Sequence, residues 1–176
     1  MARDPDNVKL WVDAKIYLSD AAVRPALPAD VATDFGAEWI GAGILNGEDG
    51  MPEERAQEES KFYGWNIGLV KVSSRNRELS RTFSPMEDNP VIRGLVWPGS
   101  TATKVPMPAP VYRWIAFETD DDFGARERLI ATRQARLWVP SNNYTETDAT
   151  KWEVQVQLFA DGNGDVFDRQ IPAVTP

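Results

Sequence analysis

Residues 151–159 read KWEVQVQLF, and this stretch alternates more clearly than any other part of the chain. Its apolar and polar side chains fall on opposite parities: Trp152, Val154, Val156 and Leu158 against Lys151, Glu153, Gln155 and Gln157. Successive side chains of a β-strand point to opposite faces, so a period of two predicts a strand with one buried and one solvated face. Such a strand is typical of an antiparallel sheet that covers a core on one side only.

Further strands are expected on both sides of this stretch. Residues 128–139 also alternate, although Arg133 interrupts their apolar parity; the polar side carries Arg128, Thr132, Gln134 and Arg136. Additional strands are indicated at 8–19, 39–45, 62–73, 79–86, 111–118 and 166–171. About eight strands separated by turns predict a mainly β domain of two packed antiparallel sheets, as a sandwich or barrel. The domain is expected to span residues 1–176.

One short helix is expected at 87–97, which reads EDNPVIRGLVW. Asp88 or Asn89 can cap its first turn, and Pro90 suits the first helical position because its missing N–H is not needed there. The apolar residues that follow recur at helical spacing, and Pro98 and Gly99 end the pattern. The sequence therefore predicts one helix that flanks the sheets.

Residues 46–61 form a polar interval between two expected strands. Six acids and one arginine lie between Glu48 and Glu59. A solvated loop or a short surface helix would explain this composition. Loops longer than about 12–15 residues are uncommon inside compact domains and are often functional. A contact arm is therefore the second interpretation of this acidic loop.

Composition excludes several kinds of chemistry. The 176 residues contain no Cys and no His, so disulfides, thiolate nucleophiles and His-dependent catalytic triads are excluded. The net charge is −8 and Lys and Arg are not clustered, which disfavours binding to a phosphate backbone. Residues 1–10 are polar and no run of about 18 apolar residues occurs, so neither a signal peptide nor a membrane span is expected.

No catalytic, cofactor or metal site is expected. Asp161, Asn163 and Asp165 resemble the start of a calcium-binding EF-hand loop, but Val166 and Pro172 stand where that loop needs Gly and Glu. A hairpin turn explains the same residues. Paired carboxylates among Glu118, Glu153 and residues 120–122 could serve a glycosidase, but nothing distinguishes them from solvated charge. The seven Trp are typical of a core or a subunit interface more often than of a carbohydrate groove.

The order of these features resembles one known family. Trp39-Ile40-Gly41 precedes a Glu-Asp-Gly turn at 48–50, and Gly64-Trp65-Asn66 and a Thr82-Phe83 strand follow. The helix start at 87–90 leads to Trp97, and Ala116-Phe117-Glu118, Arg128, Ala135 and the 152–159 strand complete the series. This series resembles the major tail proteins, or tail tube proteins, of long non-contractile-tailed phages (siphophages), especially those of actinobacterial hosts.

The resemblance implies a structural subunit of a virion, assembled in the host cytoplasm. Proteins of this family form homohexameric rings that stack into a tail tube, the channel for DNA ejection. The implied partners are further copies of the chain, a tape measure protein in the lumen, and tail terminator and tail-tip proteins at the ends. Viral DNA would pass through without specific binding, which agrees with the negative net charge.

The resemblance also suggests roles for particular residues. An inter-ring contact loop would contain Glu48, Asp49, Glu53, Glu54, Arg55, Glu58 and Glu59. Lumen-facing candidates are Arg128, Thr132, Gln134, Arg136, Lys151, Glu153, Gln155 and Gln157. The helix would lie at a subunit seam or on the outer face, through Asp88, Asn89, Pro90 and Trp97. Residues 1–7 would form an N-terminal arm and residues 172–176 a C-terminal tail.

Several alternatives stay open at this point, for single residues and for the function. Arg128 or Arg136 could pair with acids instead of facing a lumen, and the alternating strands could line a subunit interface. The chain could also be a monomeric β-sandwich binding module of a virion, such as a carbohydrate-binding or decoration domain. A carboxylate-based hydrolase is a third class. A binding module would stay monomeric and bind glycan, whereas a hydrolase would lose turnover when one specific acid is replaced.

Overall fold

The computed structural model describes residues 8–147 and 149–172, and the expected N-terminal arm and residues 173–176 of the expected tail lie outside them. The elements in chain order are β1 (Trp11–Ser19), β2 (Ile40–Gly41), β3 (Glu53–Gly64), β4 (Gly68–Phe83), α1 (Pro90–Val96), β5 (Val111–Asp121), β6 (Arg126–Ala131), β7 (Ala135–Trp138), β8 (Val154–Leu158) and β9 (Phe167–Gln170). The predicted mainly β fold with one short helix is confirmed.

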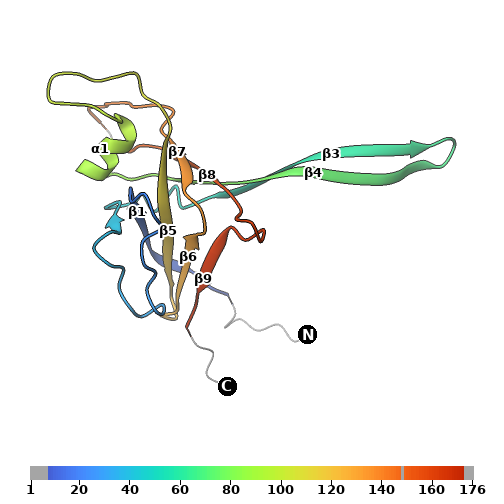
Figure 1. Cartoon of the computed structure of the whole chain (residues 1–176), viewed down its shortest axis with the longest axis horizontal. Coiled ribbons are helices and arrows are strands. Elements are labelled where there is room, and N and C mark those ends of the chain that lie inside the picture. Colours follow the sequence, from blue (N-terminus) through green and yellow to red (C-terminus); the bar gives the residue numbers. More distant parts are fainter. Residues whose placement is uncertain (1–7, 148, 173–176) are drawn as a thin grey trace.

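All strand pairs are antiparallel, and β5 connects two halves of one nine-stranded sheet. The main path is β2-β1-β5-β7-β8-β4-β3, and β6 pairs with both β5 and β9. The two expected sheets are therefore joined through β5. One half contains β2, β1, β5, β6 and β9, and the other contains the start of β5 with β7, β8, β4 and β3 (Figure 1).

The sheet divides where the expected 128–139 strand is interrupted. Both β6 and β7 pair with β5: Ala116 is opposite Ile130, and Arg113 is opposite Ala135. The chain therefore advances three residues along β5 but five residues from β6 to β7. Two extra residues are thus inserted at the position of Arg133. Beyond the insertion, β6 pairs with β9 and β7 pairs with β8, so the layers separate there.

One hydrophobic core lies between the two halves of the sheet. Ile16 and Phe117 come from the first half, and Leu137, Val154 and Val156 come from the second; each is almost inaccessible to solvent. The side of β8 that faces the core therefore carries the apolar residues that the alternation predicted to be buried. A smaller cluster of Trp39, Ala116 and Ile130 lies on the other side of β5 and β6, with the partly buried residues Tyr17, Phe35 and Trp114.

The helix forms for the predicted reasons. Asn89 is extended, and its side-chain oxygen accepts a hydrogen bond from the Ile92 N–H at 2.9 Å. Pro90 occupies the first turn, and Ile92, Leu95 and Val96 are buried against the core. Asp88 forms an ion pair with Arg93, and Trp97 is the C-cap. The helix lies beside β7 (Figure 1), and its place at a subunit seam stays a prediction.

The prediction of a long acidic loop over residues 46–61 is wrong for its second half. Residues 53–64 are β3, and together with β4 they form one long hairpin in place of the two strands expected at 62–73 and 79–86. The turn lies at residues 65–67, not at Arg75-Asn76. Both faces of most of this hairpin are exposed, so its residues have no need to alternate, and periodicity cannot reveal it.

Candidate functional site: a projecting hairpin and an exposed sheet face

The β3–β4 hairpin projects far from the body of the molecule (Figure 1). Only Leu79–Phe83 of β4 pair with β8, so the rest of the hairpin leaves the sheet. Arg81 holds its root: the guanidinium forms two hydrogen bonds with Glu53, at 2.6 and 2.9 Å. The same guanidinium lies 4.8 Å from the Phe117 ring and 5.3 Å from the Phe167 ring, measured to the centroids. The root is therefore fixed to the core.

The end of the hairpin is apolar and exposed. Trp65 in the turn is 96% exposed and Ile67 is 80% exposed. Other exposed apolar side chains precede and follow the turn: Phe62, Tyr63, Leu69, Val70 and Val72. Soluble monomers rarely expose contiguous apolar patches larger than a few hundred Å². A cluster of this kind at the end of a long arm therefore indicates a surface that another molecule covers.

Charge divides the hairpin into two parts. Residues 60–77 contain four basic side chains and no acid: Lys61, Lys71, Arg75 and Arg77. The whole hairpin from 53 to 83 has six basic and five acidic residues, so it is net +1, and the rest of the chain is net −9. The acids lie at the root and midway along the hairpin, where Glu58 is opposite Arg75, and only the basic residues Lys61 and Lys71 flank the apolar end.

The expected contact residues lie before β3 or on its first seven residues. Glu48 and Asp49 are in the connection before β3, where Asp49 accepts hydrogen bonds from Lys151 Nζ at 2.8 Å. These bonds hold the pKa of Asp49 below its ordinary value. The remaining expected contact residues lie on β3: Glu53, Glu54, Arg55, Glu58 and Glu59.

Two of these β3 residues have contacts across or along the hairpin. Glu53 binds Arg55 as well as Arg81; burial acts to raise its pKa, but the two arginines hold that pKa below its ordinary value. Glu58 accepts a hydrogen bond from Asn76 at 2.7 Å. Their role in contacts between rings stays a prediction. The sequence pattern had placed the apolar end of the arm in an expected strand at 62–73 and had not predicted that it projects.

A partly exposed polar face lies on β7 and β8: Gln155 is exposed, and Arg136, Trp138 and Gln157 are partly buried. Arg136 is paired with Gln157, and Trp138 with Gln155, so these side chains form adjacent rows on the side away from the core. Glu153 and Lys151 precede β8 and are exposed. Five of the eight lumen candidates therefore lie on or beside this face: Arg136, Lys151, Glu153, Gln155 and Gln157.

Thr132 and Gln134 lie in the interruption between β6 and β7. Thr132 Oγ1 donates to the Asp165 carbonyl at 2.7 Å, and Gln134 Nε2 donates to the Ala21 carbonyl at 3.2 Å. Both side chains are partly buried and hold neighbouring loops. They therefore connect the two layers of the sheet as well as bordering the polar face.

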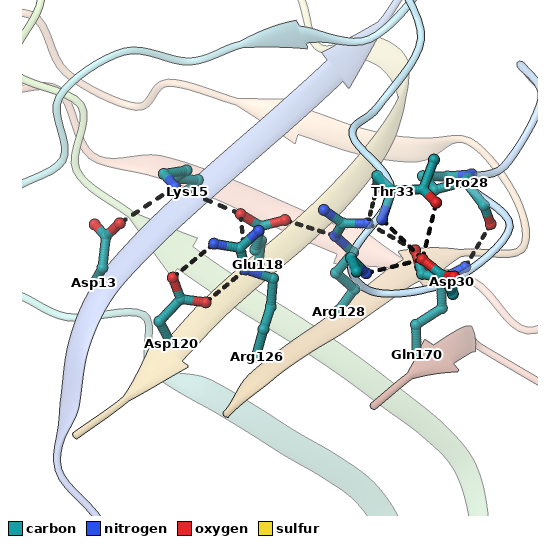
Figure 2. A network of polar contacts seen from close by, with 11 residues as sticks. Asp13, Lys15, Pro28, Asp30, Thr33, Glu118, Asp120, Arg126, Arg128 and Gln170 are labelled. Carbon is teal, nitrogen blue, oxygen red and sulfur yellow. Dashed lines mark hydrogen bonds and ion pairs between the residues drawn. The ribbon is translucent and has the colours of Figure 1, made fainter. Parts of the chain in front are cut away.

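Arg128 does not face solvent, so its prediction as a lumen residue is wrong. It is 1% exposed, and its Nε donates to Glu118 Oε2 at 2.6 Å (Figure 2). Its Nη1 donates to the carbonyl oxygens of Asp30 and Thr33, and its guanidinium lies 4.7 Å from the Phe35 ring centroid. The segment between β1 and β2 covers this polar side chain, and the alternative of pairing with an acid is confirmed for Arg128.

The carboxylates considered for hydrolysis have partners within the chain. Glu118 also lies 3.6 Å from Lys15 and 3.5 Å from Arg126, while Asp120 pairs with Arg126 at 2.7 Å and Asp121 with Lys9 at 2.6 Å. A hydrogen bond from Arg126 lowers the pKa of Asp120 below its ordinary value. Lys15, Glu118, Asp120 and Arg126 belong to the network of Figure 2, which joins β1, β5 and β6.

Asp161 stabilises its own turn. Its Oδ1 accepts hydrogen bonds from the N–H groups of Asn163 and Asp165. These bonds lower the pKa of Asp161, and the bond from Asp165 has the largest effect. The turn connects β8 to β9, which do not pair with each other, so it is not the expected hairpin turn. Among residues 8–147 and 149–172, no group of three His, Cys, Asp or Glu is arranged to hold a metal ion, and no helix is long enough to span a membrane.

A cavity of about 910 Å³ lies beside β1. Its walls include residues 11–17 of β1, the segment 41–51 and Arg81 at the hairpin root. Strand β2 pairs with β1 only at Tyr17 and Leu18, so the outer edge of residues 11–16 pairs with no strand in the described part of the chain. The cavity therefore has both an apolar lining and a free strand edge.

No family model matches the sequence, and no match is found among curated proteins. Among solved structures, the tube-terminating cap of an anti-feeding prophage, determined by cryo-EM, is similar with 13% sequence identity and a TM-score of 0.37. The similarity covers 87% of this chain and 96% of that chain. A TM-score of this size does not establish a common fold.

Proposed function

We propose that this chain is a structural subunit that assembles with further copies of itself into a phage tail tube. The observation that carries the proposal is the projecting hairpin, whose exposed end includes Trp65 and Ile67. Burial of such side chains releases about 1.5–3 kcal/mol each, so a hairpin that holds them in solvent is suited to association. A monomeric module would have no use for an arm of this length.

Free strand edges support the same proposal. In the described residues, the outer edge of β3, the outer edge of β9 and residues 11–16 of β1 have no strand partner. Unpaired edges promote pairing with other chains, and a closed ring of subunits removes them. Hexameric rings that stack into a tube, as the sequence resemblance suggests, would satisfy these edges.

The polar face of β7 and β8 is our proposed channel lining. Gln155 and Gln157 are neutral, Lys151 is paired with Asp49, and Glu153 and Arg136 carry opposite charges, so this face has no cluster of basic side chains. Without such a cluster the face has no strong attraction for phosphate, so DNA can pass without adhering. Tape measure, terminator and tail-tip proteins would then be partners at the lumen and at the two ends of the tube.

A shortened hairpin tests the proposal. Replacement of residues 59–74 by Asn-Gly removes the apolar end but keeps the Glu58–Arg75 pair beside a two-residue turn. We expect wild type to sediment as concentration-dependent oligomers and the variant to sediment as a monomer with an unchanged melting temperature. Equal assembly of the two proteins would contradict the proposal.

A further inference from the structure

Two surfaces of this chain have complementary character. One is the hairpin tip, residues 62–70, which is apolar and uncharged. The other is the cavity beside β1, which is lined by apolar residues such as Val12, Ile44 and Met51. We propose that the hairpin tip of one copy inserts into the β1 cavity of a neighbouring copy. This inference rests on the proposed self-assembly and names the surface that receives the arm.

The tip cannot fill the cavity of its own chain. Arg81, at the hairpin root, lines the cavity, and β3 runs outward for 12 residues from Glu53 to Gly64. At about 3.3 Å per residue, the tip lies roughly 40 Å from the root. An arm and a receptor at opposite ends of one rigid hairpin produce a head-to-tail contact, which propagates from copy to copy.

The tip is large enough to form a stable contact. Phe62, Tyr63 and Trp65 are each more than half exposed. Aromatic side chains bury about 150–250 Å² each, so the exposed shares of these three (53%, 69% and 96%) supply roughly 330–550 Å². A standard interface buries about 800 Å² per partner, and the aliphatic side chains of Ile67, Leu69 and Val70 complete that area.

Backbone pairing would add specificity. The outer edge of β1 between Trp11 and Lys15 is available beside the cavity, and the outer edge of β3 is available on the hairpin. An extended segment can add to a free sheet edge through main-chain hydrogen bonds, while pockets receive alternate side chains. The incoming hairpin therefore offers both a free strand edge for main-chain hydrogen bonds and side chains for the cavity.

Charge favours a second copy as the occupant. Lys61 and Lys71 flank the tip, and in the described part of the chain neither forms an ion pair. The cavity is lined by three acids, Asp13, Glu87 and Glu127, and by two basic residues, Lys15 and Arg81. Each of these except Glu87 has an ion pair within its own chain, so Glu87 is the acid that is left for an incoming lysine. A basic arm and an acidic body therefore attract each other between copies.

Cross-linking tests this docking because the natural chain has no Cys. A tagged Ile67→Cys copy, with its thiol at the tip, is mixed with an untagged Ile44→Cys copy, with its thiol at the cavity wall. A short bis-maleimide is added at a concentration where wild type assembles. The matched control replaces Ile44→Cys by Met107→Cys, which is also highly exposed but lies outside the cavity. We expect at least tenfold more mixed dimer with Ile44→Cys than with the control.

The outcomes separate this inference from the function on which it rests. Normal assembly with no cross-link above the control would refute docking in the cavity and leave self-assembly intact. Absence of both assembly and cross-link would refute both. Flotation of wild type with phosphatidylserine vesicles, lost in Trp65→Ser, would show that a membrane covers the tip and would likewise overturn the docking proposal.

Discussion

Arg128 illustrates what a single buried charge does in this molecule. Its guanidinium binds Glu118 and two carbonyl oxygens of the segment between β1 and β2, and it stacks near Phe35. These contacts fasten that segment over the outer side of β5 and β6. Because Arg128 and Glu118 are both nearly inaccessible, loss of one leaves the other buried without its main partner.

Arg128→Met should therefore strongly destabilise the fold. Breaking a buried pair by removing one partner costs about 3–5 kcal/mol of unfolding free energy. Lys15 and Arg126 also approach Glu118, so we expect the lower part of that range. Urea unfolding measures it. The matched control is Arg169→Met, which breaks an exposed pair with Glu127 and should cost at most about 1 kcal/mol. Equal losses of unfolding free energy in the two variants would contradict the structural role of the buried Arg128–Glu118 pair.

Between pH 2 and 7, stability should change only at the acidic end. The pKa values of Asp120, Asp121 and Asp161 are lowered in the fold, so their contributions are present above the unfolded pKa of about 3.9 and are lost as pH falls through the folded values. The chain has no His, so unfolding free energy should stay flat between pH 6 and 7. Urea midpoints from pH 2 to 7 test this, and Asp120→Asn should reduce the acid loss.

The burial of Arg128 could not be predicted from alternation. A polar residue on the side away from the core is usually solvated, and Arg136 is partly exposed there. At Arg128 the irregular segment that contains Asp30, Phe35 and Trp39 forms a second layer. Such a segment has no period, so the sequence pattern cannot show what it covers.

At the level of elements, the helix and the hairpin differ in how well sequence describes them. The helix has local signals: a capping Asn89, Pro90 and an apolar stripe. The hairpin lacks them, because strands solvated on both faces do not alternate. Its turn uses Asn66 at φ 60° and Gly68 at φ 85°, and Asn76 at φ 49° marks a bulge in β4. That bulge is why Arg75-Asn76 resembled a turn.

Asn89→Ala should weaken the helix start. Loss of the cap leaves an N–H of the first turn unsatisfied and costs about 0.5–2 kcal/mol. Asn89→Ser keeps an acceptor oxygen and should retain most of the stability. Thermal unfolding of both variants measures the difference. Identical melting temperatures for the two variants would show that the side-chain cap is not responsible.

For the whole molecule, the separation of charge matters more than the total of −8. Residues 60–77, whose four charged side chains are all basic, extend away from the rest of the chain, which carries a net charge of −9. The net charge of −8 and the lack of basic clusters had suggested a surface that repels nucleic acid. The structure shows that the sign changes along the arm, which only the placement of β3 and β4 could reveal.

Assembly should therefore weaken with salt. Raising NaCl from about 0.05 to 0.5 M shortens the screening length from roughly 14 to 4 Å and reduces attraction between arm and body. Lys61→Gln with Lys71→Gln should lower assembly at low salt and flatten this dependence. Lys104→Gln, a body lysine, is the control. Sedimentation velocity measures each protein, and an unchanged salt response in the double variant would refute the charge argument.

Electron microscopy of the purified wild-type chain at high concentration tests self-assembly most directly. Our account predicts hollow rings or tubes in which the hairpin reaches from each subunit into the next. If the wild-type chain forms none, the sample is repeated with a tail-tip complex as nucleus. A chain that stays monomeric even then would contradict the account and indicate a monomeric binding module.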